Sequence, residues 1–357
     1  MKVKVLHISH TDIRYDSRIQ KEILSLAKLN FLEISSIGIS NKNKYEKKII
    51  KKVTIFSLNL ITRKIFPIKS FLYTLNFIEL SFKIIKIGIT IKPKIIHCHD
   101  TLVLLPAVFL KILINSKIIY DAHELESNKN MQTYIISKAT YLIEQFSWSY
   151  IDVLVSVSKS INEWYIREFG FKKNILIFNS PIYKKNVLIN NDRYDLRKIF
   201  DIESKNLLFI YVGDFCNGRG IDYILEVFSD ANIKSHVVFL GDGILKNKIL
   251  NFSQENNNIH FHPSVKHDQV VNLIKSSDVG ICFIENVSLS DYYCLPNKLF
   301  EYLFAGLEIL GSDIPEISEF INLNKIGKVC KLNIDDLKLK IKDYENKKTK
   351  KIKLNLD

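Results

Sequence analysis

Short apolar stretches with the spacing of β-strands alternate with stretches that have the spacing of amphipathic helices along most of this chain. One series runs from residues 2–9 to residues 175–178, and a second runs from residues 207–212 to residues 279–283. Strands that alternate with helices form parallel sheets that helices cover on both faces. The pattern therefore predicts an α/β protein with two parallel sheets.

A polar segment without periodicity, residues 179–201, separates the two series. A chain of 357 residues is also long enough for two domains. We therefore expect two Rossmann-like domains that face a cleft. The expected divisions are residues 1–180, a linker at 181–205, residues 206–340 and a basic tail at 341–357.

Composition limits the compartment and the partners. The five cysteines are scattered and form no C-x-x-C pair, which suits a reducing compartment and argues against a disulfide framework or a zinc cluster. The sequence shows no secretory signal and no apolar run long enough to span a membrane, so we expect a cytoplasmic protein. The net charge of +13 could attract phosphate-rich substrates, anionic lipid or nucleic acid. Because lysines are spread over the whole chain, we expect no nucleic-acid partner.

The sequence SDYYCLPNKLFEYLFAGLEILGSDIPE contains the most informative local pattern. We expect Pro296 at the first position of a helix, where its missing N–H costs nothing. The unpaired N–H groups and the helix dipole would then form an anion site at Asn297, Lys298 and Leu299. Such a site, with Glu301 one turn later, suits a nucleotide diphosphate and its ribose. The alternative is an ordinary amphipathic helix whose lysine faces solvent.

Glycine-rich turns follow two strands of the second series. IYVGDFCNGRGID contains Gly213, Gly218 and Gly220, with Arg219 available for a phosphate. FLGDG provides another turn, in which Gly241 could form part of the floor of a ligand site. Ligands of open α/β sheets bind at the carboxyl ends of strands, so both turns are candidates for ligand contact.

The first loop of the chain, SHTDIRYDSR, lacks the G-x-G-x-x-G pattern, which argues against a nicotinamide or flavin site there. Asp16 fits the cap of the helix that follows. Arg14 and Arg18 could hold phosphate or could be surface charges.

Histidines follow at two further strand ends. Strand alternation puts His97 and His99 on one face, next to Asp100. A metal would need further ligands that are not evident in the sequence, so we expect a polar cluster and no functional metal. His123 and Glu124 directly follow an apolar strand and are candidates for chemistry at the same edge. A purely structural histidine is the alternative.

Several phrases, taken in order, resemble the retaining glycosyltransferases of family 4, which have the GT-B fold. They are HTDIRYDSRIQKE, IIHCHDTLVLLPA, YDAHEL, VSVSKSINEW, YVGDFCNGRGID, VFLGDG and LPNKLFEYLFAGLEILGSDIPE, within residues 1–340. The resemblance implies transfer of a sugar from a nucleotide diphosphate sugar to a glycan or lipid-linked acceptor, with retention and without a cofactor or an obligatory metal. It also implies a role in cell-surface polysaccharide synthesis.

The resemblance also implies roles for individual residues. Glu301 would hold the ribose hydroxyls, and Lys298 matches the lysine of the family variant that reads PNKLFEY. Arg219 would contact the diphosphate, and His123 would lie near the transferred sugar. The expected catalytic residues are His123, Arg219 and Lys298. The expected donor-binding residues are Gly213, Gly220, Gly241, Pro296, Asn297, Leu299 and Glu301. The expected acceptor-side residues are His10, Asp12, Arg18, His99, Asp100 and Glu124.

Four features depart from the family pattern. Tyr293 replaces the first glutamate of the E-x7-E motif, Asp214 replaces a loop arginine, and Glu308 replaces a proline. Ending at Asp357, the chain would also lack the C-terminal helix that crosses back in the family. These departures keep an alternative open, in which the chain is a non-catalytic nucleotide-binding partner of another glycosyltransferase.

Residues 61–91 combine four phenylalanines with five basic residues. This composition is typical of a helix on an anionic membrane surface, and core helices are the alternative. We expect two helices broken at Pro67, and peripheral binding to the inner face of the cytoplasmic membrane.

Overall fold

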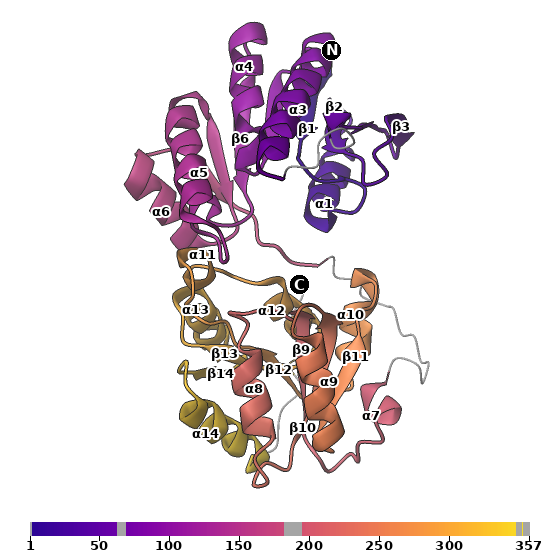
Figure 1. The fold of residues 1–357 in the computed structure, drawn as a ribbon, viewed down its shortest axis with the longest axis vertical. Coiled ribbons are helices and arrows are strands. Elements are labelled where there is room, and N and C mark those ends of the chain that lie inside the picture. Colours follow the sequence, from indigo (N-terminus) through magenta and orange to yellow (C-terminus); the bar gives the residue numbers. More distant parts are fainter. Residues whose placement is uncertain (1, 63–68, 182–194, 348–351, 353–357) are drawn as a thin grey trace. The chain divides into compact units, whose positions relative to one another are not determined.

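The computed structural model describes residues 2–62, 69–181, 195–347 and 352. Its contacts divide the chain into two compact units, unit 1 with residues 1–178 and unit 2 with residues 179–357. Each unit is built around one sheet flanked by helices (Figure 1). The division falls close to residue 180, where the first domain was expected to end.

Unit 1 contains an eight-stranded sheet in the order β3-β4-β2-β1-β5-β6-β7-β8. The strands are β1 Val3–Ile8, β2 Leu32–Ile39, β3 Glu46–Ile50, β4 Val53–Leu58, β5 Ile95–His99, β6 Lys117–Ala122, β7 Val153–Ser156 and β8 Asn174–Leu176. Neighbouring strands are parallel except β3 and β4. The sequence did not predict β3, because this exposed edge strand, EKKII, has no apolar alternation.

The helices of unit 1 connect these strands. They are α1 Ser17–Leu26, α3 Lys69–Ile91, α4 Leu104–Ile114, α5 Tyr134–Ser147 and α6 Lys159–Phe169, with short 3-10 turns η1 Thr101–Val103, η2 Glu126–Asn128 and η3 Trp148–Tyr150. As expected, Asp16 caps α1, since its Oδ1 accepts a hydrogen bond from the N–H of Ile19 at 3.1 Å. Pro67, the expected break between two helices, lies outside the described residues. Neither α3 nor any other described helix is long and apolar enough to cross a membrane.

Unit 2 contains a parallel six-stranded sheet in the order β11-β10-β9-β12-β13-β14. The strands are β9 Leu208–Asp214, β10 His236–Asp242, β11 Ile259–Pro263, β12 Val279–Cys282, β13 Glu308–Ser312 and β14 Gly327–Cys330. The helices are α7 Leu196–Ile199, α8 Ile221–Phe228, α9 Lys246–Glu255, α10 His267–Ile274, α11 Leu289–Tyr292, α12 Asn297–Ala305, α13 Pro315–Asn324 and α14 Ile334–Glu345.

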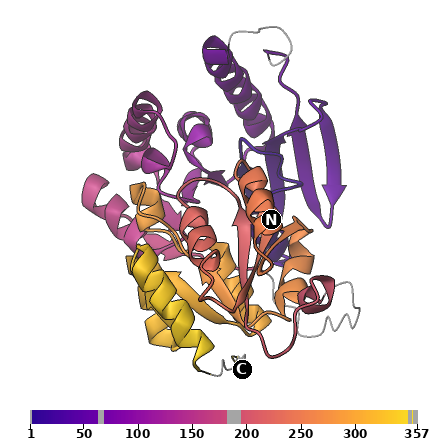
Figure 2. The same cartoon turned by 60° about the horizontal axis from the view of Figure 1, so that its bottom comes forward.

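Two helices lie in segments that were expected to be a linker and a tail. In the expected linker, α7 buries Leu196 in the core of unit 2, and the guanidinium of Arg197 bonds the carbonyl of Ser276. In the expected tail, the last turns of α14 bury Ile341 and Tyr344, and the helix lies against α8 (Figure 2, yellow). Their spacing of three residues fits one helix face, but the many lysines around them make the segment look like a solvated run.

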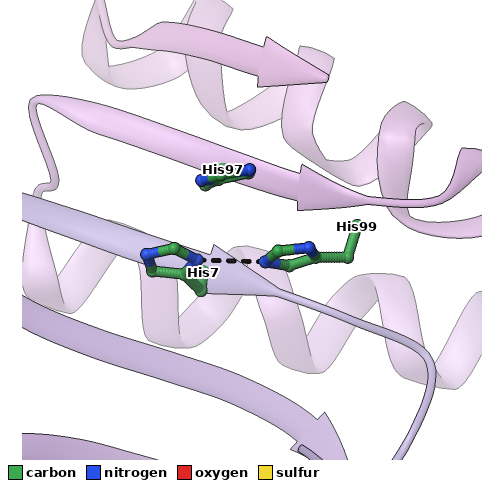
Figure 3. A group of neighbouring side chains, drawn as sticks. All are labelled: His7, His97 and His99. Carbon is green, nitrogen blue, oxygen red and sulfur yellow. Dashed lines mark hydrogen bonds between the residues drawn. The ribbon is translucent and has the colours of Figure 1, made fainter. Parts of the chain in front are cut away.

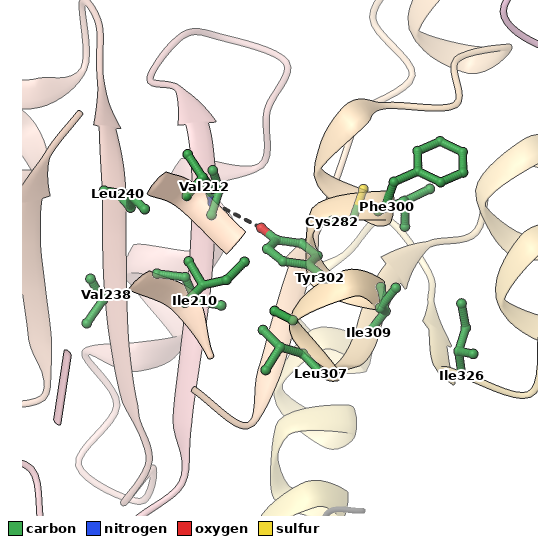
Figure 4. Packing of buried hydrophobic residues seen from close by; sticks show 14 of the residues in the cluster. Ile210, Val212, Val238, Leu240, Cys282, Phe300, Tyr302, Leu307, Ile309 and Ile326 are labelled. Carbon is green, nitrogen blue, oxygen red and sulfur yellow. Dashed lines mark hydrogen bonds between the residues drawn. The ribbon is translucent and has the colours of Figure 1, made fainter. Parts of the chain in front are cut away.

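A tyrosine of α12 forms hydrogen bonds with two central strands of the unit 2 sheet. The hydroxyl of Tyr302 accepts from the N–H of Val212 on β9 at 3.0 Å (Figure 4). It also donates to the carbonyl of Ile281 on β12 at 3.0 Å. Its ring lies so close to β12 that a Cβ on Gly280 would be 2.2 Å from the ring. These contacts hold the first turn of α12 next to the carboxyl ends of β9 and β12.

Candidate functional site

Each sheet reverses its strand order beside its first strand, which is where ligands of open α/β sheets bind. In unit 2 the chain moves outward from β9 through β10 to β11 and returns on the other side of β9 with β12. In unit 1 the corresponding reversal lies between β1 and β5. The loops at these strand ends carry most of the residues that the sequence singled out.

The start of α12 differs in detail from the expected anion site. The helix begins at Asn297, and Pro296 is its extended cap with φ −76° and ψ 150°. The N–H of Leu299 donates to the carbonyl of Pro296 at 3.1 Å, so it is already paired, contrary to our expectation. A helix start leaves its first N–H groups without intrahelical acceptors, and in α12 these are the N–H groups of Asn297 and Lys298.

Lys298 does not face solvent, so the alternative of an ordinary surface lysine is wrong. The residue is 8% exposed, and its Nζ has no hydrogen-bond partner among the described residues. The ammonium lies 3.7 Å from the ring centroid of Tyr211, and a Cβ on Gly213 would be 3.6 Å from it. Burial lowers its pKa to about 8. The side chain is thus a buried cation beside the carboxyl end of β9.

Arg219 extends from the loop between β9 and α8. Its Nη1 donates to Oδ1 of Asp291 on α11 at 2.7 Å, and Asp291 is itself buried. Burial alone would lower the pKa of Arg219, but the carboxylate of Asp291 outweighs it and the pKa is raised. Ser288 fixes Asp291 in turn, through a 2.9 Å bond to Oδ2. The arginine is therefore held in one orientation by a residue that the sequence did not single out.

Glu301 and the glycines complete this edge of unit 2. Glu301 is 5% exposed, and its Oε1 lies 3.4 Å from Nδ1 of His267 at the start of α10. Gly220 has φ +68°, and its N–H donates to Oε1 of Glu285 at 2.9 Å. Gly213 and Gly241 lie in the paired strands β9 and β10 and not in the turns that the sequence had suggested. A Cβ on Gly241 would lie 1.9 Å from the carbonyl oxygen of Gly213, so the two strand ends approach more closely than other residues allow.

In unit 1, three histidines from β1 and β5 lie together in the sheet (Figure 3). Nδ1 of His7 lies 3.0 Å from Nε2 of His99, and the ring of His97 stacks on both neighbours at centroid distances of 4.6 Å and 4.5 Å. Burial and the neighbouring His97 lower the pKa of His99 to about 4. The shared face of His97 and His99 agrees with the expected polar cluster.

Asp121, the next-to-last residue of β6, is the centre of this cluster. Its Oδ2 lies 3.2 Å from Nδ1 of His99, 3.3 Å from Nε2 of His123 and 3.6 Å from Nε2 of His97. Its Oδ1 accepts from Nη2 of Arg18 at 2.7 Å. Burial alone would raise the pKa of Asp121, but the histidines, His123 foremost, lower it well below its usual value.

Arg18 is not a surface charge. The residue is 5% exposed, its Nε lies 3.3 Å from Oε1 of Glu22, and its Nη1 donates to the carbonyl of Ile177 at 3.0 Å. Burial and the nearby Asp121 raise the pKa of Glu22 to about 7. Arg14 is also paired, since it forms two bonds to the carboxylate of Asp12 at 2.8 Å and 2.7 Å.

The cluster also contains enough ligand atoms for a metal ion, because those of Glu22, His97, His99 and Asp121 lie within 4.8 Å of one another. Two of these residues come from α1 and β6, which is why the sequence did not suggest them. The rings of His97 and His99 are nearly parallel, with 15° between their planes, so their lone pairs do not converge on one ion. Arg18 already lies at ion-pair distance from both carboxylates, 3.3 Å from Glu22 and 2.7 Å from Asp121. The geometry favours a buried ionic cluster over a metal centre.

The remaining acceptor-side candidates lie in different surroundings. A cavity of about 300 Å³ is lined by His10, Thr11, Asp12, Tyr15, Asp16, Ile39 and Asn41. Asp100 and His123 adjoin the ionic cluster, with 3.4 Å between Oδ1 of Asp100 and Nδ1 of His123. Glu124 is exposed and contacts Lys129 at 4.0 Å, so the structure does not bring it into the cavity or the cluster.

One comparison with known proteins concerns unit 2. Residues 192–355 match the model of the family described as glycosyl transferases group 1. A search of curated proteins found no match.

Solved structures resemble the whole chain. Sucrose-phosphate synthase from Thermosynechococcus elongatus has a TM-score of 0.73 at 13% identity, over 96% of this chain and 89% of that one. Anabaena HepE in complex with UDP-glucose has a TM-score of 0.68 at 10% identity, over 95% and 89%. The lipopolysaccharide outer core galactosyltransferase WaaB has a TM-score of 0.66 at 16% identity, over 98% and 92%. The fold is therefore GT-B, and residues 192–355 carry the match to glycosyl transferases group 1.

Proposed function

We propose that the chain is a retaining glycosyltransferase of family 4 that moves a sugar from a nucleotide diphosphate sugar to a glycan or lipid-linked acceptor, in the synthesis of a cell-surface polysaccharide. The observation that carries this proposal is the ammonium of Lys298, which is buried and has no hydrogen-bond partner among the described residues. A buried ammonium that contacts an aromatic ring but has no hydrogen-bond acceptor is costly and indicates an anionic ligand. It lies in the part of the chain that matches group 1 glycosyl transferases.

The cations of unit 2 would stabilise the leaving diphosphate. When the bond between C1 of the sugar and the phosphate oxygen breaks, negative charge develops on the diphosphate. Arg219, Lys298 and the N–H groups at the start of α12 are oriented before the reaction, and such groups contribute about 3–4 kcal/mol each. Because the protein supplies this charge, we propose that transfer needs neither a metal at the diphosphate nor a cofactor.

Retention would follow from attack on the face that the diphosphate leaves. The acceptor oxygen forms a bond to C1 as the bond from C1 to the phosphate breaks, and the acceptor proton passes to the released phosphate. In this proposal His123 lies near the transferred sugar. Glu301 accepts hydrogen bonds from the ribose hydroxyls, while Gly213, Gly220 and Gly241 let the backbone approach the donor.

The cavity of unit 1 has the character of a sugar site. Its lining combines short polar side chains with Tyr15, which is 69% exposed. An exposed aromatic ring offers a flat apolar face, and the carboxylate of Asp16 can accept hydrogen bonds from sugar hydroxyls. We propose that the acceptor glycan contacts this cavity.

A donor panel tests the proposed activity. Nucleoside diphosphates and nucleotide sugars are expected to raise the melting temperature, since a ligand at 100 times its Kd stabilises the folded state by about 2.7 kcal/mol. Uridine nucleotides come first, because HepE was solved with UDP and with UDP-glucose. The shift should be the same in EDTA, and Glu301→Gln should weaken ribose nucleotides more than 2′-deoxyribose nucleotides.

Each result of this panel has a distinct meaning. Donor hydrolysis or transfer supports an enzyme, whereas binding without turnover favours the non-catalytic partner. If no nucleotide raises the melting temperature, the proposed donor site is wrong. A shift that EDTA abolishes and one divalent ion restores contradicts the metal-independent mechanism.

We also propose that unit 1 binds weakly to anionic membranes in the cytoplasm. One face of α3 belongs to the core, since Leu80 and Ile84 are buried. This agrees with the alternative expectation of core helices in this segment. The helix also exposes Ile78, Phe82 and Ile89, and the neighbouring α4 exposes Phe109, Ile112 and Leu113. Apolar side chains with nearby lysines such as the exposed Lys86 suit an anionic surface.

Vesicle co-sedimentation tests this surface. Binding to anionic vesicles is expected at low salt and should weaken at high salt, because the attraction decays over about 10 Å at 0.1 M salt. Phe82→Ser, which removes a ring that is 70% exposed, should reduce binding. Leu323→Ser, at a position 73% exposed in unit 2, should not. Equal binding of the two variants to the vesicles would show that α3 does not contact the membrane.

A further inference from the structure

We propose that Asp100 is a positioning residue that, together with Asp121, holds the imidazole of His123 in one orientation with both ring nitrogens protonated. Asp100 does so from an unfavourable backbone conformation. The consequence for sugar transfer rests on the proposed function, whereas the positioning itself does not.

The backbone of Asp100 is the first observation. The residue follows β5 directly and has φ +68° and ψ 166°, a region that is essentially restricted to glycine. Its N–H donates to the carbonyl of Asp121 at 3.1 Å, which continues the pairing of β5 with β6 by one residue. Such conformations persist where the surrounding structure demands them, and they concentrate at functional sites. A glycine would adopt this backbone without strain. We therefore infer that the carboxylate of Asp100 makes a contact that offsets the strain.

The side chain of Asp100 is the second observation. It is buried, with its Oδ1 3.4 Å from Nδ1 of His123 and its Oδ2 3.8 Å from Nδ1 of His10. On the opposite edge of the same imidazole, Oδ2 of Asp121 lies 3.3 Å from Nε2 of His123. Each nitrogen of His123 therefore faces a carboxylate at ion-pair distance. One ring can satisfy both carboxylates only when it carries both protons.

The charges around His123 support an imidazolium. Asp121 faces it from β6, Asp100 and the neutral His99 from the end of β5, Arg18 and Glu22 from α1, and His10 from the loop after β1. Glu126 of η2 and Lys129 beyond it act on the carboxylate of Asp100. Burial and Arg18 lower the pKa of His123, but the two carboxylates outweigh them and raise it to about 9. A fixed imidazolium cannot act as a general base. It can supply a positive charge of constant position.

Two variants separate the backbone effect from the side-chain effect. Asp100→Ala and Asp100→Gly both remove the carboxylate, but only glycine relieves the backbone. We expect the glycine variant to melt about 2–4 °C above the alanine variant. Equal melting temperatures would show that the conformation carries no strain, and would overturn the proposal.

Histidine NMR tests the positioning without any substrate. The chain has 9 histidines, and His123→Gln identifies the resonance of His123. In both Asp100 variants the pKa of His123 is expected to fall by about one unit or more, because an opposite charge has been removed. Glu163→Gln, which removes an exposed carboxylate of α6, should leave it unchanged. An unchanged pKa in Asp100→Gly would overturn the proposal.

Sugar transfer provides the last measurement. Both Asp100 variants are expected to lower kcat/KM by about tenfold to a hundredfold, as misplaced groups do, although the glycine variant is the more stable of the two. The wild type could lack transferase activity while the pKa of His123 still falls in the Asp100 variants. That result would support the positioning role and refute the proposed function. Full activity in both variants would refute the functional role of Asp100.

Discussion

Lys298→Met is expected to weaken binding of a nucleoside diphosphate by about 1.5–3 kcal/mol, the value of a charge-assisted hydrogen bond. Methionine keeps much of the apolar volume of the buried side chain but removes the ammonium that lies beside Gly213. Because the free protein no longer buries an ammonium without a hydrogen-bond acceptor, the variant should also fold at least as stably as the wild type. Isothermal titration with UDP measures the affinity, and urea unfolding measures the stability.

The pH dependence of the same titration gives a second signature. Burial lowers the pKa of Lys298 to about 8, so the ammonium is charged at neutral pH and loses its proton as the pH rises through that value. Wild-type affinity is therefore expected to fall between about pH 7 and 9, well below the range of an ordinary lysine near 10.4. Lys298→Met should lack this decline. Lys205→Ala, on the exposed surface of unit 2, should behave as the wild type.

Gly280→Ala is expected to cost about 2–4 kcal/mol of stability, which combines overpacking with the loss of a buried hydrogen bond. The new Cβ would lie 2.2 Å from the ring of Tyr302 and would force it away from Val212 and Ile281. Since this tyrosine holds α12 against the sheet, donor binding should weaken as well. Urea unfolding measures the loss of stability.

A double-mutant cycle distinguishes this contact from a general effect of alanine in β12. In a Tyr302→Ala background the ring is absent, so Gly280→Ala should cost much less than in the wild type. Additive costs would show that the strain arises elsewhere. Tyr302→Phe, which removes only the hydroxyl, should cost about 1–3 kcal/mol because the N–H of Val212 loses its acceptor.

The residues of the unit 2 site could be found from the sequence because each has a local signal. Pro296, Lys298 and Glu301 lie within one helical turn and a half, and Arg219 lies in a glycine-rich turn directly after a strand. Their partners could not be found in this way. Asp291 is 72 residues from Arg219, and its own neighbourhood, LSDYY, suggests no contact with that loop.

Contacts that have no local signal in the sequence also explain where our expectations were wrong. Leu299 was expected to offer a free N–H, but a short turn closes between it and Pro296. Arg18 was expected to be available for phosphate or to be a surface charge, but Asp121, which is 103 residues away, reaches it across the sheet. The expected linker contains α7 and the expected tail contains the last turns of α14, and the few apolar residues of these segments lie between charged residues but reach the core.

Hydrophobic periodicity is a property of consecutive residues, so the sequence by itself determined the alternating strands and helices, the two sheets and the edge of each sheet where polar loops gather. Only the tertiary structure decided which charged side chains are buried and which groups they pair with. Lys298 is buried because Tyr302 holds α12 against β9 and β12, and His123 lies between two carboxylates because β5 and β6 are neighbours. The strength of an ionic interaction depends on burial and on distances between groups far apart in the chain, which only strand order and packing establish.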